Sequence, residues 1–417
     1  MIIARVKKSI QNLTFNKIFI SLFLIVYCGL YYQEYVALIA CSYALLGGAF
    51  IYNLIKHRGL IYKDFIVLCL IFVIYSFFSS LWAESFDTSY NSVIQLSKSA
   101  VVAICFITLI DSKEHFKWAL FILSLSGIIY ALLYLNHVDI SSLGANRIMA
   151  EGDFLPNVNT VGLIISFSFA YFIYMYFLDK KYVYMALAGL AFIVTFFLGS
   201  RKSIISLFIC VFLMFIKLQK TSKLKILFLL VLLIALLLFY VPIEYLNFIS
   251  ERLAQLSFWS SKMSEIDSSD ETRVRLIEYG LTYCIESPIL GHGYYSFSQL
   301  FRKDCGIILY SHNNFIETFV GGGIIGFFIY YSLHGIILKR IDLRKAHFDY
   351  GYLLFVLLMI LLFNHFSIVV LQDRFVWLLL TVLFTGSPQF GHTCHSSFNS
   401  VPHFLQNILF PLYHKYQ

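Results

Sequence analysis

Charged side chains are scarce in this sequence of 417 residues. Aspartate, glutamate, lysine and arginine make up 13% of it, whereas hydrophobic residues make up 59%. The apolar residues come in repeated blocks that are long enough to cross a hydrocarbon core of about 30 Å. This composition excludes a soluble globular protein and predicts an all-α, polytopic integral membrane protein.

We also expect no cleavable leader, and the cysteines and histidines form no complete metal-ligand pattern or disulfide framework. Its basic N-terminal segment runs into a full-length apolar span without a small-residue cleavage pattern. His392, Cys394 and His395 in the C-terminal tail do not complete a four-ligand set, so we expect no metal site there. Cys284 and Cys305 share a polar loop, which leaves a disulfide open, although two cysteines define no framework.

Apolar stretches indicate about twelve membrane helices, the last of them short. They lie at residues 18–34, 36–55, 64–82, 93–110, 117–135, 158–178, 182–199, 202–218, 225–245, 314–338, 350–371 and 374–386. This pattern divides the chain into four parts. Nine helices occupy residues 1–245, a large polar loop occupies 246–313, three helices occupy 314–386, and a tail follows at 387–417.

Lysine and arginine residues gather in alternate loops. They precede the first span and follow the second, fourth, sixth, eighth and tenth. Because positive charge in short loops stays cytoplasmic, we expect both termini in the cytoplasm and the loop 246–313 on the outer face of a bacterial inner membrane. The net charge of +8 is thus a signal of topology, and it predicts no nucleic-acid partner.

Four arginines break this pattern, because they lie on the expected outer face: Arg147, Arg201, Arg273 and Arg275. An arginine at mid-span costs about 2.5–3.5 kcal/mol on insertion scales, so arginines against span ends need a reason. A guanidinium group binds phosphate oxygens at two points, which favours an anionic ligand. The alternative is pairing with lipid headgroups or with the outer acids Glu151, Asp153 and Glu271.

The polar loop contains a predicted helix that carries two of these arginines. Asp270 or Thr272 is the expected N-cap, which puts Arg273 in the first turn, where free N–H groups also favour a phosphate. We expect the helix to end at Ser287-Pro288, before a flexible turn at 291–293. An apolar stripe recurs along it at helical spacing, formed by Val274, Ile277, Leu281, Cys284 and Ile285.

His312 directly precedes an apolar span. Histidine can remove a proton from a sugar hydroxyl near neutral pH if a neighbour orients it. Asn313, Asn314 and Glu317 are the polar neighbours, and an interfacial histidine at a helix start is the alternative. The glycines of the span indicate close helix packing rather than a phosphate-binding loop, and they are Gly321, Gly322, Gly323 and Gly326.

The order of these features resembles the O-antigen polymerase and O-antigen ligase superfamily. The matching residues are Arg147 with the stretch 157–162, Gly199-Ser200-Arg201, Arg273 with Pro288, Gly291 and Gly293, and His312-Asn313 with Gly323 and Gly326. The resemblance covers residues 145–335. Two positions depart from it, since Val158 replaces a proline and Ile277 replaces a tryptophan, but neither carries chemistry.

The resemblance implies a membrane-embedded (GT-C-like) glycosyltransferase whose donor is a sugar chain on undecaprenyl diphosphate, with no metal or cofactor. It implies that Arg201 and Arg273 clamp the diphosphate leaving group and that His312 activates the acceptor hydroxyl. The further substrate contacts that we expect are Arg147, Arg275, Asn313 and Asn159.

A polymerase is favoured over a ligase that hands the chain to lipid A core. The third alternative, a transporter of lipid-linked oligosaccharides, should show internal repeats, which we do not find. Besides membrane lipid, a flippase and a chain-length regulator are expected partners by analogy.

Overall fold

The computed structural model describes residues 14–29, 36–57, 59–136, 158–198, 200–217, 268–341, 343 and 349–386. All regular structure in these residues is helical. In chain order the elements are α2 (Phe15–Leu24), the π-helical turn η1 (Ile25–Gly29), α3 (Val36–Lys56), α4 (Lys63–Ser79), the 3-10 turn η3 (Ser80–Trp82), α5 (Phe86–Ile107), α6 (Lys113–Asn136), α7 (Val158–Asp179), α8 (Tyr182–Phe197), α9 (Arg201–Lys217), α12 (Ser268–Glu286), α13 (Phe297–Cys305), α14 (Asn314–Arg340), α15 (Tyr350–His365) and α16 (Arg374–Gly386).

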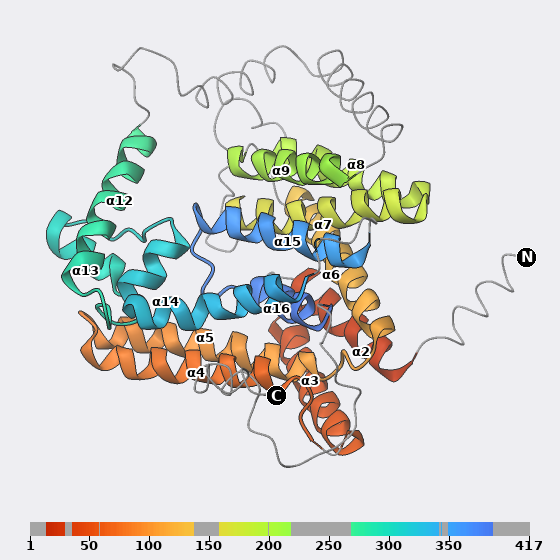
Figure 1. The fold of residues 1–417 in the computed structure, drawn as a ribbon, viewed down its shortest axis with the longest axis horizontal. Coiled ribbons are helices and arrows are strands. Elements are labelled where there is room, and N and C mark those ends of the chain that lie inside the picture. Colours follow the sequence, from red (N-terminus) through yellow and green to blue (C-terminus); the bar gives the residue numbers. More distant parts are fainter. Residues whose placement is uncertain are drawn as a thin grey trace, which may run out of the picture.

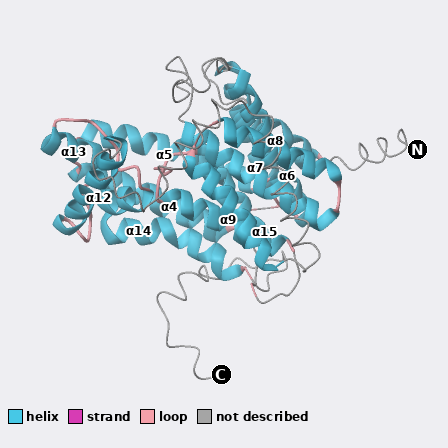
Figure 2. Ribbon diagram, turned by 90° about the horizontal axis from the view of Figure 1, so that it is seen from above, coloured by secondary structure: helices cyan, strands magenta, loops and turns pink. Residues whose placement is uncertain are grey.

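The predicted class is confirmed, because the described helices are those of a polytopic membrane protein. Six of the described helices are long and apolar enough to cross a membrane, and four shorter ones are apolar as well. The predicted span at 225–245 and the tail at 387–417 lie outside the described residues. Every other predicted span overlaps a helix. The predicted loop 246–313 contains α12 and α13, which lie together at one end of the bundle (Figures 1 and 2).

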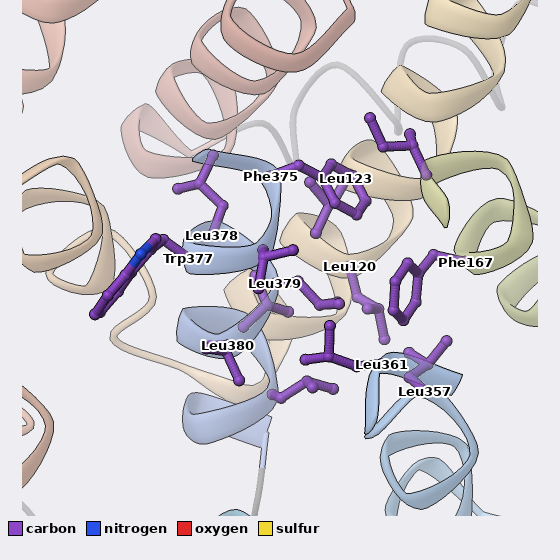
Figure 3. Packing of buried hydrophobic residues seen from close by; sticks show 14 of the residues in the cluster. Leu120, Leu123, Phe167, Leu357, Leu361, Phe375, Trp377, Leu378, Leu379 and Leu380 are labelled. Carbon is purple, nitrogen blue, oxygen red and sulfur yellow. The ribbon is translucent and has the colours of Figure 1, made fainter. Parts of the chain in front are cut away.

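α16 is the central helix of the bundle. Its residues from Phe375 to Phe384 are all buried. In Figure 3 it lies among side chains of α6, α7 and α15, including Leu120, Phe167 and Leu361. Trp377 points to the other side, where its ring centroid lies 6.4 Å from that of Phe72 in α4. A helix that is apolar all round is stable only inside such an enclosure.

The connection between α15 and α16 is partly buried in the bundle: Ile368, Val370 and Leu371 are buried, whereas Phe366 is 65% exposed. α15 has 16 residues and α16 has 13, which give lengths of about 24 Å and about 20 Å at ~1.5 Å per residue, less than the ~30 Å of hydrocarbon. Ser99 Oγ, in the interior of α5, donates to Gln372 O at 2.8 Å. The predicted span 350–371 is therefore wrong at its end, because α15 stops at His365 and the non-helical connection 366–373 follows.

α14 is bent sharply at Gly323. This residue has φ 57° and ψ −163°, far from helical values. The ring of Phe319 lies 5.8 Å from that of Phe327, and the ring of Phe315 lies 5.0 Å from that of Tyr331. The two residues of each pair are equally far from Gly323 in the sequence, one before it and one after it. Their contact therefore shows that the chain doubles back at Gly323.

α14 thus forms a V with a short arm at residues 314–322 and a long arm at 324–340. The prediction of one unbroken span at 314–338 is wrong. The long arm of 17 residues, about 26 Å by helical rise, ends beside the start of α4, where Arg340 pairs with Asp64 at 3.4 Å. The short arm begins at the end of the bundle that carries α12 and α13 (Figure 1).

Candidate functional site

The loop after α12 supplies the hydrogen bonds that the bend in α14 breaks. The N–H of Ile324 donates to Pro288 O at 2.8 Å, and the N–H of His292 donates to Val320 O at 2.7 Å. Tyr75 of α4 donates its hydroxyl to Gly322 O at 2.7 Å. Because backbone groups in a membrane must be paired inside the protein, this loop is part of the bend.

The glycines of the two motifs fit against each other. A Cβ atom on Gly291 would lie 2.5 Å from Gly323 N, and one on Gly293 would lie 2.6 Å from the Cα of Ala83. On Gly326 it would lie 2.8 Å from the ring of Tyr75. The close helix packing that the sequence predicts is confirmed at Gly326, which lies against Tyr75 of α4, but the partner of Gly323 is a loop and not a helix.

Asn313 and His312 form the turn that starts the short arm. Asn313 is the N-cap, and its Oδ1 accepts the N–H groups of Phe315 at 2.9 Å and Ile316 at 3.2 Å. His312 has φ 53°, and its ring centroid lies 3.9 Å from that of Tyr310. The backbone conformation of His312 is one that L-residues rarely adopt, so the turn must be held by its neighbours.

Glu317 holds this turn from inside the short arm. Its side chain is buried, and Oε2 accepts hydrogen bonds from Ser311 N at 3.2 Å and Ser311 Oγ at 2.7 Å. Among the described residues Oε1 has no hydrogen-bond partner. Glu317 lines a small cavity with Tyr294, Ser76 and Thr318, and this cavity has room for about one water molecule.

The connection 366–373 bonds both the start of α9 and the start of α14. Lys202 Nζ donates to Ser367 O at 2.5 Å. Three residues further along, the N–H of Val370 donates to Asn314 Oδ1 at 2.9 Å. The connection therefore forms a floor between the two helix starts, and irregular backbone at this depth is tolerated where protein covers it or where it lines a cavity.

Asn159 lies on the α9 side of this floor. Its Oδ1 accepts a hydrogen bond from Ser200 Oγ at 3.4 Å, and Arg201 is the first residue of α9. A Cβ atom on Gly162 would overlap the Ser203 hydroxyl, so α7 and α9 pack closely here. The structure thus brings the starts of α7 and α9 together at the end of the bundle where the His312 turn lies.

α12 begins earlier than the sequence predicts. Its first residue is Ser268, so Asp270 and Thr272 lie within the helix and neither is the N-cap. Arg273 consequently lies in the second turn, too far from the helix start for a direct contact with free N–H groups, and the predicted phosphate contact to that turn loses its support.

α12 packs against the short arm of α14. A Cβ atom on Gly280 would lie 2.5 Å from Ile316 Cγ2. Arg273 is two turns before Gly280 and so lies on the same side of α12, whereas Arg275 is exposed. The structure therefore connects the arginine helix to the His312 turn through Gly280 and Ile316.

The described site does not include three of the predicted polar residues or a disulfide. Arg147, Glu151 and Asp153 lie outside the described residues. The described cysteines are all free, including Cys284 and Cys305, so the disulfide that the sequence left open is not formed. Burial raises the pKa of the Cys284 thiol to about 11.

The sequence did not indicate that Lys202 and Ser367 contact each other at the floor. It indicated Asn314 only as a polar neighbour of His312. A signal was available for Asn314, since it stands in the polar run Ser311 to Asn314 at a helix start. No comparable signal marks Ser367.

Residues 186–331 match the family model described as O-antigen ligase. The match runs from α8 into the long arm of α14 and so contains the starts of α9 and α14 as well as α12. Over these residues the chain is similar to the O-antigen ligase family, which supports the resemblance to the superfamily of O-antigen polymerases and ligases. Members of this family are glycosyltransferase-like enzymes. A comparison with curated proteins finds none that matches the chain.

Proposed function

We propose that this protein is an O-antigen polymerase. It transfers a growing O-polysaccharide chain from undecaprenyl diphosphate onto a new lipid-linked repeat unit, at the periplasmic face of the inner membrane. The similarity of residues 186–331 to the O-antigen ligase family supports the enzyme class. The basic loops of the sequence support an orientation with both termini in the cytoplasm.

The proposed site is supported by the hydrogen bonds that the connection 366–373 makes to the starts of α9 and α14. Lys202, next to Arg201, donates to Ser367 O of the connection 366–373, and the N–H of Val370 in the same connection donates to Asn314, next to Asn313. An arginine suited to a diphosphate and a histidine turn suited to proton removal therefore stand on two sides of one floor.

In the proposed reaction the acceptor hydroxyl oxygen attacks the anomeric carbon of the donor sugar, while the bond from that carbon to the diphosphate oxygen breaks. His312 takes the hydroxyl proton, and undecaprenyl diphosphate leaves. Arg201 and Arg273 neutralise the charge that develops on the leaving diphosphate, so that no metal ion is needed. The remaining proposed substrate contacts are Arg147, Arg275, Asn159 and Asn313.

A ligase is the second candidate, because the family that matches residues 186–331 is described as O-antigen ligase. The two candidates share donor, leaving group and site chemistry. They differ in the acceptor, which is a lipid-linked repeat unit for a polymerase and lipid A core for a ligase.

Lipopolysaccharide from cells that lack this gene, with and without the gene restored, separates the two on a gel. For a polymerase we expect core that bears a single repeat unit in the deletion and a ladder on restoration. Bare core in the deletion, with long chains accumulating on undecaprenyl diphosphate, would establish the ligase instead. An unchanged gel would overturn both.

Single variants test the assigned roles. We expect Arg201→Ala, Arg273→Ala and His312→Ala each to abolish the ladder while the protein stays inserted at its normal level. Arg302→Ala is the matched control, because this arginine is exposed on α13 and has no proposed role. A normal ladder from any of the first three variants removes that residue from the mechanism.

A further inference from the structure

One face of α12 is apolar and is left uncovered by the described part of the chain. The exposed fractions are 57% for Val274, 42% for Ile277, 54% for Leu281 and 79% for Ile285. The predicted apolar stripe is therefore present, but most of it does not pack against the protein. A row of four large exposed aliphatic side chains on one helix face is costly in water and marks a contact surface.

This face borders the side of α12 that packs on the bundle. Leu276, Gly280 and Tyr283 are buried, with Leu276 and Tyr283 in a cluster that includes Phe297 of α13 and Ile316 of α14. On a helix with ~100° per residue the buried and uncovered apolar residues form one broad arc. The polar residues occupy the opposite arc and are Arg275, Glu278, Thr282 and Glu286.

The C-terminal end of α12 is fixed at the level where α4 leaves the apolar layer. Trp82 Nε1 donates to Gly291 O at 3.2 Å, and the Tyr75 hydroxyl lies 3.2 Å from Leu290 O. Trp82 is 41% exposed, as expected of a tryptophan at a membrane interface.

The exposed apolar surface of α4 continues onto α12. Leu81 next to Trp82 is 65% exposed, and Ile289 and Leu290 after α12 are 61% and 47% exposed. Leu81 belongs to the membrane span Lys63–Trp82 and stands next to the tryptophan that bonds Gly291. From Gly291 the uncovered apolar side chains of Leu290, Ile289 and Ile285 lead back along the chain onto α12. The surface that faces lipid on α4 does not end at the start of the loop.

α12 also has the direction of a helix that lies along a membrane. In Figure 1 it stands upright at one end of the bundle, across the axes of α4, α5 and α14, and Figure 2 shows it at the same end after a quarter turn. A helix that starts from an interfacial anchor and runs across the bundle stays near the depth of that anchor.

We propose that α12 is an interfacial helix whose uncovered face, formed by Val274, Ile277, Leu281 and Ile285, is inserted in the adjacent leaflet of the membrane that the chain spans. Amphipathic helices of this kind sit about 5–10 Å into the boundary between headgroups and acyl chains. This depth holds Arg273, on the side of Gly280, at the level of lipid phosphates. The inference does not depend on the proposed transferase activity.

Spin labels in the full-length protein test this depth. The eight cysteines are replaced, and a nitroxide is attached at Leu281→Cys or Ile277→Cys in lipid nanodiscs. Thr282→Cys and Glu278→Cys are matched controls one residue away on the polar arc. We expect labels at 277 and 281 to collide more with oxygen, which concentrates in acyl chains, and several-fold less with a water-soluble nickel chelate than the two controls.

Each alternative occupant of this face gives a different result. Equal nickel accessibility at 281 and 282 means that the face is in water, which overturns the proposal. Protection from both reagents means that protein covers the face. Spin–spin broadening would then identify a second copy, and its absence would identify another segment of this chain, and either result also overturns the proposal.

A measurement that keeps the native cysteines guards against failure of the cysteine-free chain to fold. Leu281→Trp and Thr282→Trp are compared with the parent chain in nanodiscs that contain brominated lipid. We expect the added tryptophan at 281 to be quenched by bromine and the one at 282 to be quenched much less. Equal quenching at the two positions would contradict insertion of this face.

Discussion

Gly291 stands against Gly323 so closely that a Cβ atom on the former would lie 2.5 Å from the backbone nitrogen of the latter. The loop after α12 and the bend of α14 are therefore one packing unit. Because the short arm that begins at Asn314 leaves this bend, the unit also fixes the direction in which the His312 turn is presented.

Gly323→Ala should destabilise the protein. The residue occupies a region of backbone conformation that only glycine adopts readily, which costs an alanine about 1–3 kcal/mol, and the added methyl group would overlap Ile289 O. We expect a lower thermal midpoint in detergent. Gly335→Ala is the control, because no atom lies within 4 Å of its Cβ position and alanine favours a helix by about 1 kcal/mol. Equal thermal midpoints for the two variants would contradict the conclusion that the loop and the bend pack as one unit.

Asn314→Ala should separate the floor from the short arm. It removes the acceptor of the Val370 N–H and the donor to the Tyr331 hydroxyl, and a buried N–H without a partner costs about 1–3 kcal/mol. We expect a reduced midpoint and a loss of ladder that exceeds the loss of protein. Asn53→Ala, which also removes a buried asparagine that bonds a backbone carbonyl, should reduce the ladder only in proportion to protein level.

Glu317 should matter through the turn before His312. Glu317→Ala removes both hydrogen bonds from Ser311, and a small misplacement of a reacting group can cost about 100-fold in rate. Glu317→Gln keeps one acceptor oxygen and should retain more transfer than Glu317→Ala. Initial rates on purified lipid-linked repeat units would compare the variants. Glu278→Gln on the polar side of α12 is the control, and a rate for Glu317→Ala equal to that of the control would exclude this role.

Asp111 should make the other end of the bundle sensitive to acid. Its carboxylate lies 3.0 Å from Lys56 Nζ and 2.5 Å from His115 Nδ1. Burial acts to raise the pKa of Asp111, but hydrogen bonds from His115 and Lys56 outweigh it and hold the pKa well below its ordinary range. A lowered pKa gives stability that is present above the ordinary value of about 3.9 and is lost as the pH falls below it.

We therefore expect Asp111→Asn to lower the thermal midpoint at pH 7, and the difference from the parent to narrow as the pH falls from 5 towards about 3. Asp87→Asn, at an exposed position of α5, should change the midpoint little across this range. A constant difference between parent and Asp111→Asn at every pH would show that the carboxylate does not contribute in this way.

The positions of the membrane helices follow from the sequence because burial in lipid requires long apolar runs and leaves charge in the loops. The bend of α14 does not follow in the same way. Gly321, Gly322 and Gly323 are compatible with a straight, closely packed helix. The bent form is favoured by distant partners, which include the Pro288 carbonyl at Ile324, the His292 N–H at Val320 and the Tyr75 hydroxyl at Gly322. The nearest of them, His292, lies 28 residues from Val320 in the chain.

The residue types of the candidate site could be predicted from the sequence, but only part of its geometry could. The polar run around His312 and the arginine at the start of α9 were recognisable, because polar groups at helix ends stand out against apolar spans. The floor was not recognisable. Ser367 and Val370 contribute backbone groups, which have no signature in the sequence, and the apolar run from Tyr350 to Leu371 gives no sign that the helix ends at His365.

The packing of the 288–293 loop against the bend of α14 also limits which sequence changes the protein can tolerate. Two glycine segments pack closely against each other here, one at residues 291 and 293 and the other at 321–323. They are encoded by separate stretches of the gene. A change in one segment is tolerated only with a matching change in the other, so the two stretches should diverge together. A recombinant gene that exchanges a single segment with a distant relative should yield a protein whose short arm is misdirected, even though each segment is functional in its parent.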